Sequence, residues 1–210
     1  MSTLGTSLWE LRAGSAPLLV NVPHAGTFLP ADIRSHLTPA GLAVPDTDWH
    51  VDRLYAELLD GLDVTLMTAT HSRIVVDLNR DPAGHALYPG ASNTEICPLT
   101  TFHDEPMYRD GAVPAEPEVT QRVARYWQPY QDRLAAEIER IRARHGYCIL
   151  LDGHSIVSEA PRFFTGRLPD LNLGTADGAS CDATLADTAF AGLAAASGFT
   201  AVHNGRFKGG

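Results

Sequence analysis

Two short apolar runs, far apart in the chain, each stop at a histidine. Residues 18–22 lead into His24, residues 147–151 lead into His154, and a glycine stands beside each histidine. Runs of this length are typical of buried strands rather than helices, and the glycines mark the turns that end them. Ligands of open α/β sheets bind at the carboxyl ends of the strands. The pattern therefore predicts two strands that bring two histidines to one sheet edge.

Helical spacing of apolar residues marks three further segments. Residues 51–62 carry four leucines on one predicted face, namely Leu54, Leu58, Leu59 and Leu62. Residues 116–145 form the clearest helix, with Gly146 just past its end and Pro129 expected to kink it. Residues 183–196 are alanine-rich and also predicted to be helical.

Alternation of such helices with short apolar runs is typical of an α/β fold. The further strand predictions are residues 64–69, 73–78 and 199–202, with a possible edge strand before residue 16. Residues 27–45, 82–116 and 159–182 are rich in proline or glycine and are expected to be connections. A connection as long as 82–116 is usually functional, so we expect it to cover a substrate.

Composition excludes several classes of function. The chain has 210 residues, of which 44% are hydrophobic and 20% charged, as in a soluble globular protein, and its length suits one domain over residues 1–210. Its net charge of −9 argues against nucleic acid and anionic membranes as partners, which require basic patches. Three scattered cysteines indicate a reducing, cytoplasmic location. Neither a signal peptide nor a run of transmembrane length is evident.

The two histidines are candidate metal ligands. A single histidine at a strand end is more often a structural hydrogen-bonding group, but two in the same setting favour a metal site. A catalytic zinc ion typically takes three protein ligands and leaves a position for water, so a carboxylate is expected as the third. Asp46, Asp48 and Asp52 are the candidates, although one of the first two can instead cap the helix that follows.

Two arginines bracket the predicted strand 73–78. Arg73 and Arg80 are an odd number of positions apart and so point to opposite faces of a regular strand. Arg80 beside Asn79 is well suited to recognise a carboxylate, whereas the alternative is two surface arginines. Ser155, next to His154, is a weaker candidate nucleophile, because a catalytic serine is not recognised by adjacency to its histidine. No phosphate loop, dinucleotide fingerprint or Gly-x-Ser-x-Gly elbow is present.

In combination, these motifs resemble the N-formylglutamate amidohydrolase family. They are Pro23-His24-Ala25-Gly26, Asp48-Trp-His-Val-Asp52, Ser72-Arg73-x-x-x-Asp77-Leu-Asn-Arg80, Cys97-Pro98 with the following Thr100-Thr101-Phe102, and Leu151-Asp-Gly-His-Ser155. They occur in the family's order from about residue 17 to the end of the chain. Each motif alone is weak, but the combination is specific.

The resemblance implies a three-layer α/β sandwich with a central mixed β-sheet, like that of zinc carboxypeptidases. It implies hydrolysis of N-formyl-L-glutamate to L-glutamate and formate in histidine degradation. The implied zinc ligands are His24, His154 and an aspartate, for which Asp52 is preferred and Asp48 is the reserve; another divalent metal is the alternative. The implied partner is a small dicarboxylate substrate, and the sequence predicts no oligomeric state.

The resemblance also implies roles for the substrate-facing residues. Asn79 and Arg80 would hold a substrate carboxylate, and Arg73 would stabilise the oxyanion or grip the second carboxylate. The family pattern continues past Gly210 through a segment expected to carry the general base, so the C-terminal segment is expected to be absent here. A second departure is Phe102-His103-Asp104-Glu105, where Phe-Asp-Gly-Glu is expected.

Two other functions remain open from the sequence. One is a related deacylase that acts on a different N-acyl amino acid. The other is a non-catalytic fragment or degenerate homologue that binds a metal or a dicarboxylate.

Overall fold

The computed structural model of the protein describes residues 6–85 and 93–209. They form two compact units: unit 1 comprises the described residues up to 85 together with 93–156, and unit 2 comprises residues 157–209. Residues 86–92 of the long predicted connection lie outside the described residues. Within both described ranges, every helix is too short or too polar to cross a membrane.

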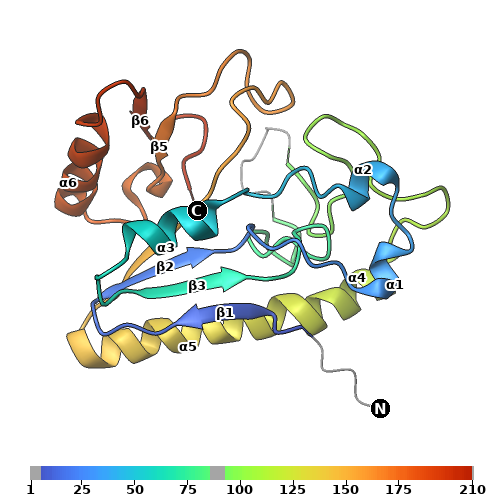
Figure 1. The fold of residues 1–210 in the computed structure, drawn as a ribbon, viewed down its shortest axis with the longest axis horizontal. Helices are drawn as coiled ribbons and strands as arrows, with labels where there is room; N and C mark the ends of the chain where they lie inside the picture. The colour runs from blue at the N-terminus through green and yellow to red at the C-terminus, as the bar shows by residue number, and fades with distance from the viewer. Residues whose placement is uncertain (1–5, 86–92, 210) are drawn as a thin grey trace. The chain divides into compact units, whose positions relative to one another are not determined.

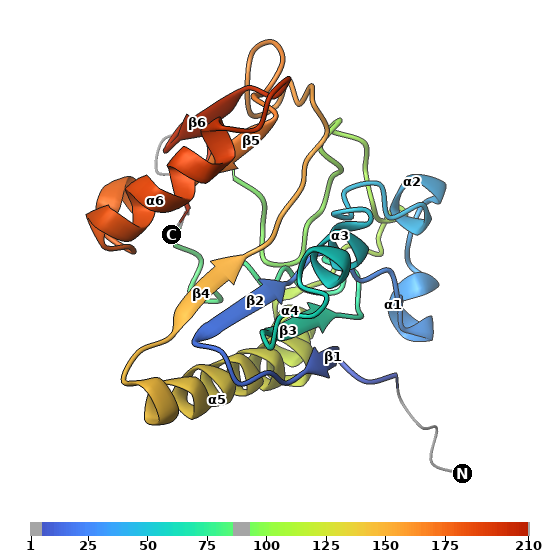
Figure 2. The same cartoon turned by 60° about the vertical axis from the view of Figure 1, so that its left-hand side comes forward.

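Unit 1 is built on a mixed four-stranded sheet. Its strands are β1 (Trp9–Arg12), β2 (Leu18–Val22), β3 (Thr65–Ala69) and β4 (Ile149–Asp152). Their order is β1-β3-β2-β4, with β1 antiparallel to β3 and with β2 parallel to both β3 and β4 (Figure 2). The expected mixed α/β class with a mixed central sheet is confirmed, and β1 is the predicted edge strand.

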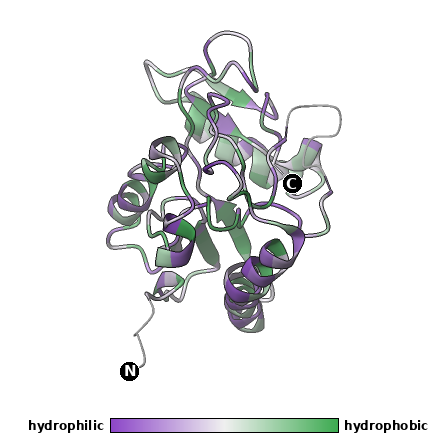
Figure 3. Ribbon diagram, turned by 90° about the vertical axis from the view of Figure 1, so that its right-hand side faces the viewer, coloured by the Kyte–Doolittle hydropathy of each residue, from purple (hydrophilic) through white to green (hydrophobic). Residues whose placement is uncertain are grey.

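Helices cover both faces of this sheet (Figure 1). Leu19 shares a buried cluster with Tyr130 of α5 (Gln128–His145), whereas the next residue, Val20, shares another with Val51 of α3 (Val51–Leu58). Alternate residues of a strand point to opposite faces, so β2 is apolar on both sides. Figure 3 accordingly shows the strands of unit 1 as hydrophobic and the helices as partly hydrophilic.

The helix α3 is shorter than predicted and buries a different face. Its buried residues are Val51 and, just past its end, Leu59, whereas Leu54 and Leu58 are 53% and 62% exposed. Val51 and Leu59 are eight residues apart, and this spacing keeps them on one side of the helix. Gly61 follows with a φ of 74°, which ends the helical path before the predicted boundary.

The remaining helices of unit 1 lie in the connections. The segment 27–45 contains the short helices α1 (Ala31–Arg34) and α2 (Pro39–Leu42). The long predicted helix is divided into α4 (Glu116–Arg122), the π-helical turn η1 (Val123–Trp127) and α5. The interruption expected near Pro129 therefore takes the form of a π turn just before it. Residues 93–115 contain isolated β-bridges but no regular helix or strand.

The predicted strand 73–78 is wrong. Ile74 and Val75 are buried, as in a strand, but the backbone turns here, because the Val75 N–H donates to the Ser72 carbonyl. The Asp77 N–H donates to the Ile96 carbonyl over 2.7 Å, outside any ladder. The apolar run thus fills a core cluster without joining the sheet.

Unit 2 contains β5 (Leu171–Leu173), the 3₁₀ helix η2 (Ala176–Gly178), α6 (Ala183–Ala194) and β6 (Ala201–His203). The strands β5 and β6 pair in parallel, and Asp182 caps α6 by accepting hydrogen bonds from the Thr184 and Leu185 N–H groups. The predicted helix and last strand are present, but β5 lies in a segment expected to be a connection.

Candidate active site and metal centre

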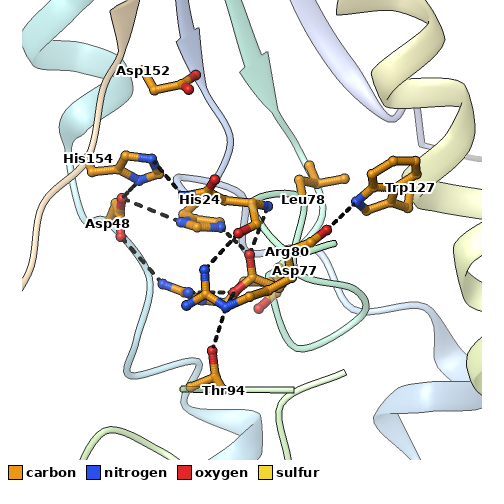
Figure 4. Close-up of polar contacts among 12 residues, drawn as sticks. His24, Asp48, Asp77, Leu78, Arg80, Thr94, Trp127, Asp152 and His154 are labelled. Atoms are coloured by element: carbon orange, nitrogen blue, oxygen red, sulfur yellow. Dashed lines mark hydrogen bonds and ion pairs between the residues drawn. The ribbon is translucent and has the colours of Figure 1, made fainter. Parts of the chain in front are cut away.

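Two parallel neighbouring strands bring the two histidines to one edge of the sheet. His24 follows β2 and His154 follows β4. The pairing continues past β4, because the Gly153 N–H donates to the Asn21 carbonyl over 2.8 Å. The ring centroids of His24 and His154 consequently lie 4.9 Å apart (Figure 4).

The glycine beside each histidine is required by close packing. A Cβ on Gly26 would lie 2.4 Å from the carbonyl oxygen of His71. A Cβ on Gly153 would lie 2.3 Å from the ring of Tyr55. Any larger residue would push the chain carrying His24 or His154 away from its neighbours.

The third candidate ligand is Asp48, in the connection just before α3. Its side chain is buried, and its backbone N–H donates to the His24 carbonyl over 3.0 Å. Its Oδ2 lies 3.0 Å from Nδ1 of His154 and 3.8 Å from Nδ1 of His24, and it accepts a hydrogen bond from the Ser155 N–H. Asp48 therefore joins the loops that carry the two histidines.

The donor set fits a metal ion. Within the described part of the chain, His24, Asp48 and His154 offer ligand atoms that all lie within 4.8 Å of one another. Bonds of about 2 Å place two ligands of a tetrahedral ion about 3.3 Å apart. The two distances from Asp48 Oδ2 to the histidines, 3.0 and 3.8 Å, bracket that separation. Two imidazoles and one buried carboxylate are also the residue types that zinc and similar ions prefer.

The other two aspartates take different positions. Asp52, which the resemblance favoured, lies in the first turn of α3 and is not among the three residues that the structure brings together. Asp46 accepts hydrogen bonds from the Phe102 N–H at 3.0 and 3.2 Å. The N-cap position of α3 is occupied by His50, with a φ of 66° and no side-chain cap, so neither Asp46 nor Asp48 caps the helix.

Asp77 is the buried carboxylate at the centre of this site, with 0% of its surface exposed. Its Oδ1 lies 2.8 Å from Nε2 of His24 and accepts the Asn79 N–H at 2.9 Å. Its Oδ2 accepts from Nη2 of Arg73 at 2.6 Å and lies 3.9 Å from Nε of Arg80. One carboxylate thus fixes a candidate metal ligand and both arginines of its own segment.

The charges around Asp77 determine the protonation of His24. Burial raises the pKa of Asp77, but the Arg73 charge, together with the hydrogen bond from His24, outweighs it and holds that pKa well below its ordinary value. Burial, followed by the Arg73 charge, lowers the pKa of His24. Because an ionised carboxylate only accepts hydrogen bonds, Nε2 of a neutral His24 carries the proton. Nδ1 then has the free lone pair, on the side of Asp48.

Arg73 is enclosed rather than directed into solvent. It is 7% exposed, pairs with Asp77, lies 4.0 Å from Oδ1 of Asp48 and stacks over the Phe102 ring at 5.1 Å. Burial lowers the pKa of Arg73, but Asp77 and Asp48 raise it further, so the guanidinium stays charged. Arg73 and Arg80 approach the same carboxylate, because residues 73–80 form no regular strand that would direct them to opposite faces.

Asn79 lies beside His154, and Arg80 lies beside Asp77. The Asn79 side-chain amide is 3.4 Å from Nε2 of His154. Arg80 is 17% exposed, and its guanidinium donates to the Thr94 hydroxyl at 3.0 Å and to the Asn79 carbonyl at 2.7 Å (Figure 4). These two side chains are more accessible than Arg73, and Asn79 reaches the candidate metal ligand His154.

Comparison with known proteins identifies the family. A model of the N-formylglutamate amidohydrolase family matches residues 16–210. The chain belongs to this family. A curated N-formylglutamate deformylase from Pseudomonas putida is 43% identical over 96% of this chain and 74% of its own length. Another from Pseudomonas aeruginosa is 45% identical over 96% of this chain and 75% of its own length.

Solved structures agree with that assignment. The crystal structure of N-formylglutamate amidohydrolase from Ralstonia eutropha has a TM-score of 0.77 and 31% identity, and covers 97% of this chain and 78% of its own. A protein from Agrobacterium tumefaciens shares the fold, with a TM-score of 0.69 and 19% identity over 95% of this chain and 73% of its own.

Asp77 is the residue of this amidohydrolase whose place the sequence did not indicate. It was part of a motif but was assigned no role. The available signal was the Arg73-x-x-x-Asp77 spacing, which pairs the two side chains when the backbone turns and not when it is extended. Reading the segment as a strand therefore concealed the pair.

Proposed function

We propose that this N-formylglutamate amidohydrolase hydrolyses N-formyl-L-glutamate to L-glutamate and formate, using a zinc ion held by His24, Asp48 and His154. The observation that carries the metal site is the convergence of these three side chains at the carboxyl ends of β2 and β4. The amide that is cleaved follows from family membership and from the names of the curated relatives.

Zinc bound here would polarise the formyl carbonyl and lower the pKa of a water molecule. The protein keeps the donor atoms ready for that ion. Asp77 holds the proton of His24 on Nε2 and so presents Nδ1 as the ligand atom. The Ser155 N–H and the His24 carbonyl hold Asp48 from its side chain and its backbone, respectively.

The substrate carboxylate is assigned to Arg80 and Asn79. A guanidinium and an amide present the donors that a carboxylate accepts, and Arg80 is only partly buried. Asn79 is also within reach of His154, so the carboxylate would be held beside the metal ligands. In a chain of net charge −9, the partly exposed Arg80 guanidinium supplies the positive charge that an anionic substrate requires.

Arg73 is assigned a positioning role in place of direct contact with the oxyanion. Its Nη2 is committed to Asp77 at 2.6 Å, and its charge lies between Asp77 and Asp48. Removal of the Arg73 charge would leave the fully buried Asp77 carboxylate without its closest partner, which costs about 3–5 kcal/mol. Its contribution is therefore to keep Asp48 and Asp77 ionised and in place.

Several features of the whole protein remain proposals. We infer a role in histidine degradation, a cytoplasmic location, a likeness to zinc carboxypeptidases and a single domain over residues 1–210.

Measurement of formate tests the proposed function. The zinc-loaded protein should release formate from N-formyl-L-glutamate, lose activity with a chelator and regain it with zinc. Higher activity towards N-acetyl-L-glutamate than towards N-formyl-L-glutamate would favour the related deacylase. A protein that binds one zinc ion per chain but releases neither formate nor acetate would favour the non-catalytic alternative. Arg80→Ala should raise KM with zinc content unchanged; an unaltered KM would remove Arg80 from carboxylate binding.

A further inference from the structure

The segment that carries the substrate-binding residues is held by side chains rather than by a sheet. Residues 72–80, named here the site segment, contain Arg73, Asp77, Asn79 and Arg80 and belong to no strand or helix. Buried backbone carbonyls need hydrogen-bond donors, and no neighbouring strand supplies them here. The donors must therefore come from elsewhere in unit 1.

Three side chains of the helical segment α4-η1-α5 supply these donors. Arg122 Nη1 donates to the carbonyls of Ile74 and Val75, both at 3.4 Å. Gln131 Nε2 donates to the Leu78 carbonyl at 2.8 Å. Trp127 Nε1 donates to the Arg80 carbonyl at 3.0 Å (Figure 4). Two of these bonds hold the backbone on either side of Asn79.

The π turn brings these donors onto one side of the helix. Arg122 and Trp127 are five residues apart, and in a regular α-helix they would point about 140° away from each other. The hydrogen bond from the Gln128 N–H to the Val123 carbonyl spans five residues and marks one extra residue in this turn. The extra residue places Trp127 where the fourth residue after Arg122 would stand in a regular α-helix, so the two side chains lie on the same side. Gln131 is four residues after Trp127 and also lies on that side.

The bond from Trp127 acts on the residue that faces the substrate. Arg80 is fixed through its own carbonyl, while its guanidinium returns to the Asn79 carbonyl at 2.7 Å. Gln131 fixes the carbonyl of Leu78, just before Asn79. The directions of the Asn79 and Arg80 side chains thus depend on where η1 and the start of α5 place two donors.

We propose that the π turn Val123–Trp127 is a positioning device for carboxylate recognition, in which Trp127 and Gln131 hold the backbone of residues 78–80 so that Arg80 and Asn79 meet the substrate. This inference rests on the proposed role of Arg80. Trp127 and Gln131 are positioning residues, since each acts on the substrate through a backbone carbonyl.

Trp127→Phe tests the proposal because it keeps an aromatic ring and removes the N–H donor. One lost hydrogen bond typically changes an equilibrium about fivefold, so KM for N-formyl-L-glutamate should rise about fivefold. The inhibition constant of glutarate, a dicarboxylate without a formyl group, should rise by a similar factor. Zinc content and kcat should remain within about twofold of wild type. A purely structural role would instead reduce the active fraction and hence kcat, with KM unchanged.

Matched variants complete the test. Gln131→Leu should behave like Trp127→Phe, whereas Gln128→Leu removes an exposed amide that bonds only to Asp132 among the described contacts and should leave KM unchanged. Trp9→Phe, in β1, controls for the exchange of the ring. An increase in KM no larger for Trp127→Phe than for Trp9→Phe would overturn the proposal.

A double-mutant cycle separates this inference from the proposed function. If Trp127 acts through Arg80, Trp127→Phe should change kcat/KM less than twofold when it is added to Arg80→Ala. The full fivefold effect in that background would assign Trp127 to another group and overturn the inference, while the carboxylate role of Arg80 stands. An Arg80→Ala variant with unaltered KM would overturn the carboxylate role itself.

Discussion

Replacement of Asp77 by Asn tests the electrostatic centre of the site. Asp77 is fully buried and accepts hydrogen bonds from His24, Arg73 and the Asn79 N–H. An asparagine side chain has one acceptor oxygen and an amide that only donates, so it can satisfy His24 or Arg73 but not both. Arg73 would then be a buried cation without its closest partner, or His24 would lose the group that keeps its proton on Nε2.

The expected losses are large. Removal of one partner from a buried ion pair costs about 3–5 kcal/mol, against a total stability of roughly 5–15 kcal/mol. For a chain of this size, each kcal/mol shifts the thermal midpoint by about 2–4 °C, so Asp77→Asn should lower it by roughly 6–20 °C. Loss of a carboxylate that orients a metal ligand typically weakens metal binding about 10–100-fold.

Two measurements check this reasoning: thermal unfolding of the metal-free protein by circular dichroism, and competition for zinc with a chelator. Asp81→Asn is the matched control, because Asp81 is exposed and pairs only with exposed His85 and the Ala83 N–H among the described residues. It should shift the free energy of unfolding by no more than about 0.5 kcal/mol. If Asp77→Asn unfolds and binds zinc like Asp81→Asn, the central role of Asp77 is wrong.

Three further predictions concern the ligand, pH and the backbone. Asp48→Asn should reduce bound zinc well below one ion per chain and Asp52→Asn should not, as measured by metal analysis; the reverse would restore Asp52 as the ligand. Burial lowers the pKa of His24 and His71 from 6.5, so the unfolded metal-free chain takes up protons first, and its thermal midpoint should fall as the pH drops below about 6.5. Equal midpoints at pH 7.5 and 5.5 would contradict this. Asp104 has a φ of 61°, so Asp104→Val should lose at least roughly 1–2 kcal/mol in urea unfolding, and an unchanged unfolding curve would contradict this.

The strands and the two histidines were predictable because their signals are local. A five-residue apolar run such as Leu18–Val22 can bury both faces only in the middle of a sheet, and the glycine after it marks the end of the strand. The same pattern before His154 placed both histidines at one edge, and the pairing of β2 with β4 accounts for their proximity.

The choice between Asp48 and Asp52 was not local. Both precede or begin the same helix, and four residues separate them. Which of them meets the histidines depends on the left-handed turn at His50 and on the bond from the Asp48 N–H to the His24 carbonyl. Such contacts join residues that are 24 positions apart, and a pattern within one segment does not encode them.

The site segment shows why apolar periodicity misjudged residues 73–78. Ile74 and Val75 are as buried as strand residues, so side-chain hydrophobicity alone reads them as a strand. What distinguishes them is the source of their hydrogen bonds, which is side chains such as Arg122, about 48 positions later, in place of a neighbouring strand. Because the backbone is free of a ladder, it can turn and direct Arg73 and Asp77 to each other. An extended strand would have placed Arg73 and Asp77 on one face but about 13 Å apart, so an irregular segment anchored to a π turn is the arrangement that gathers these charges at one point.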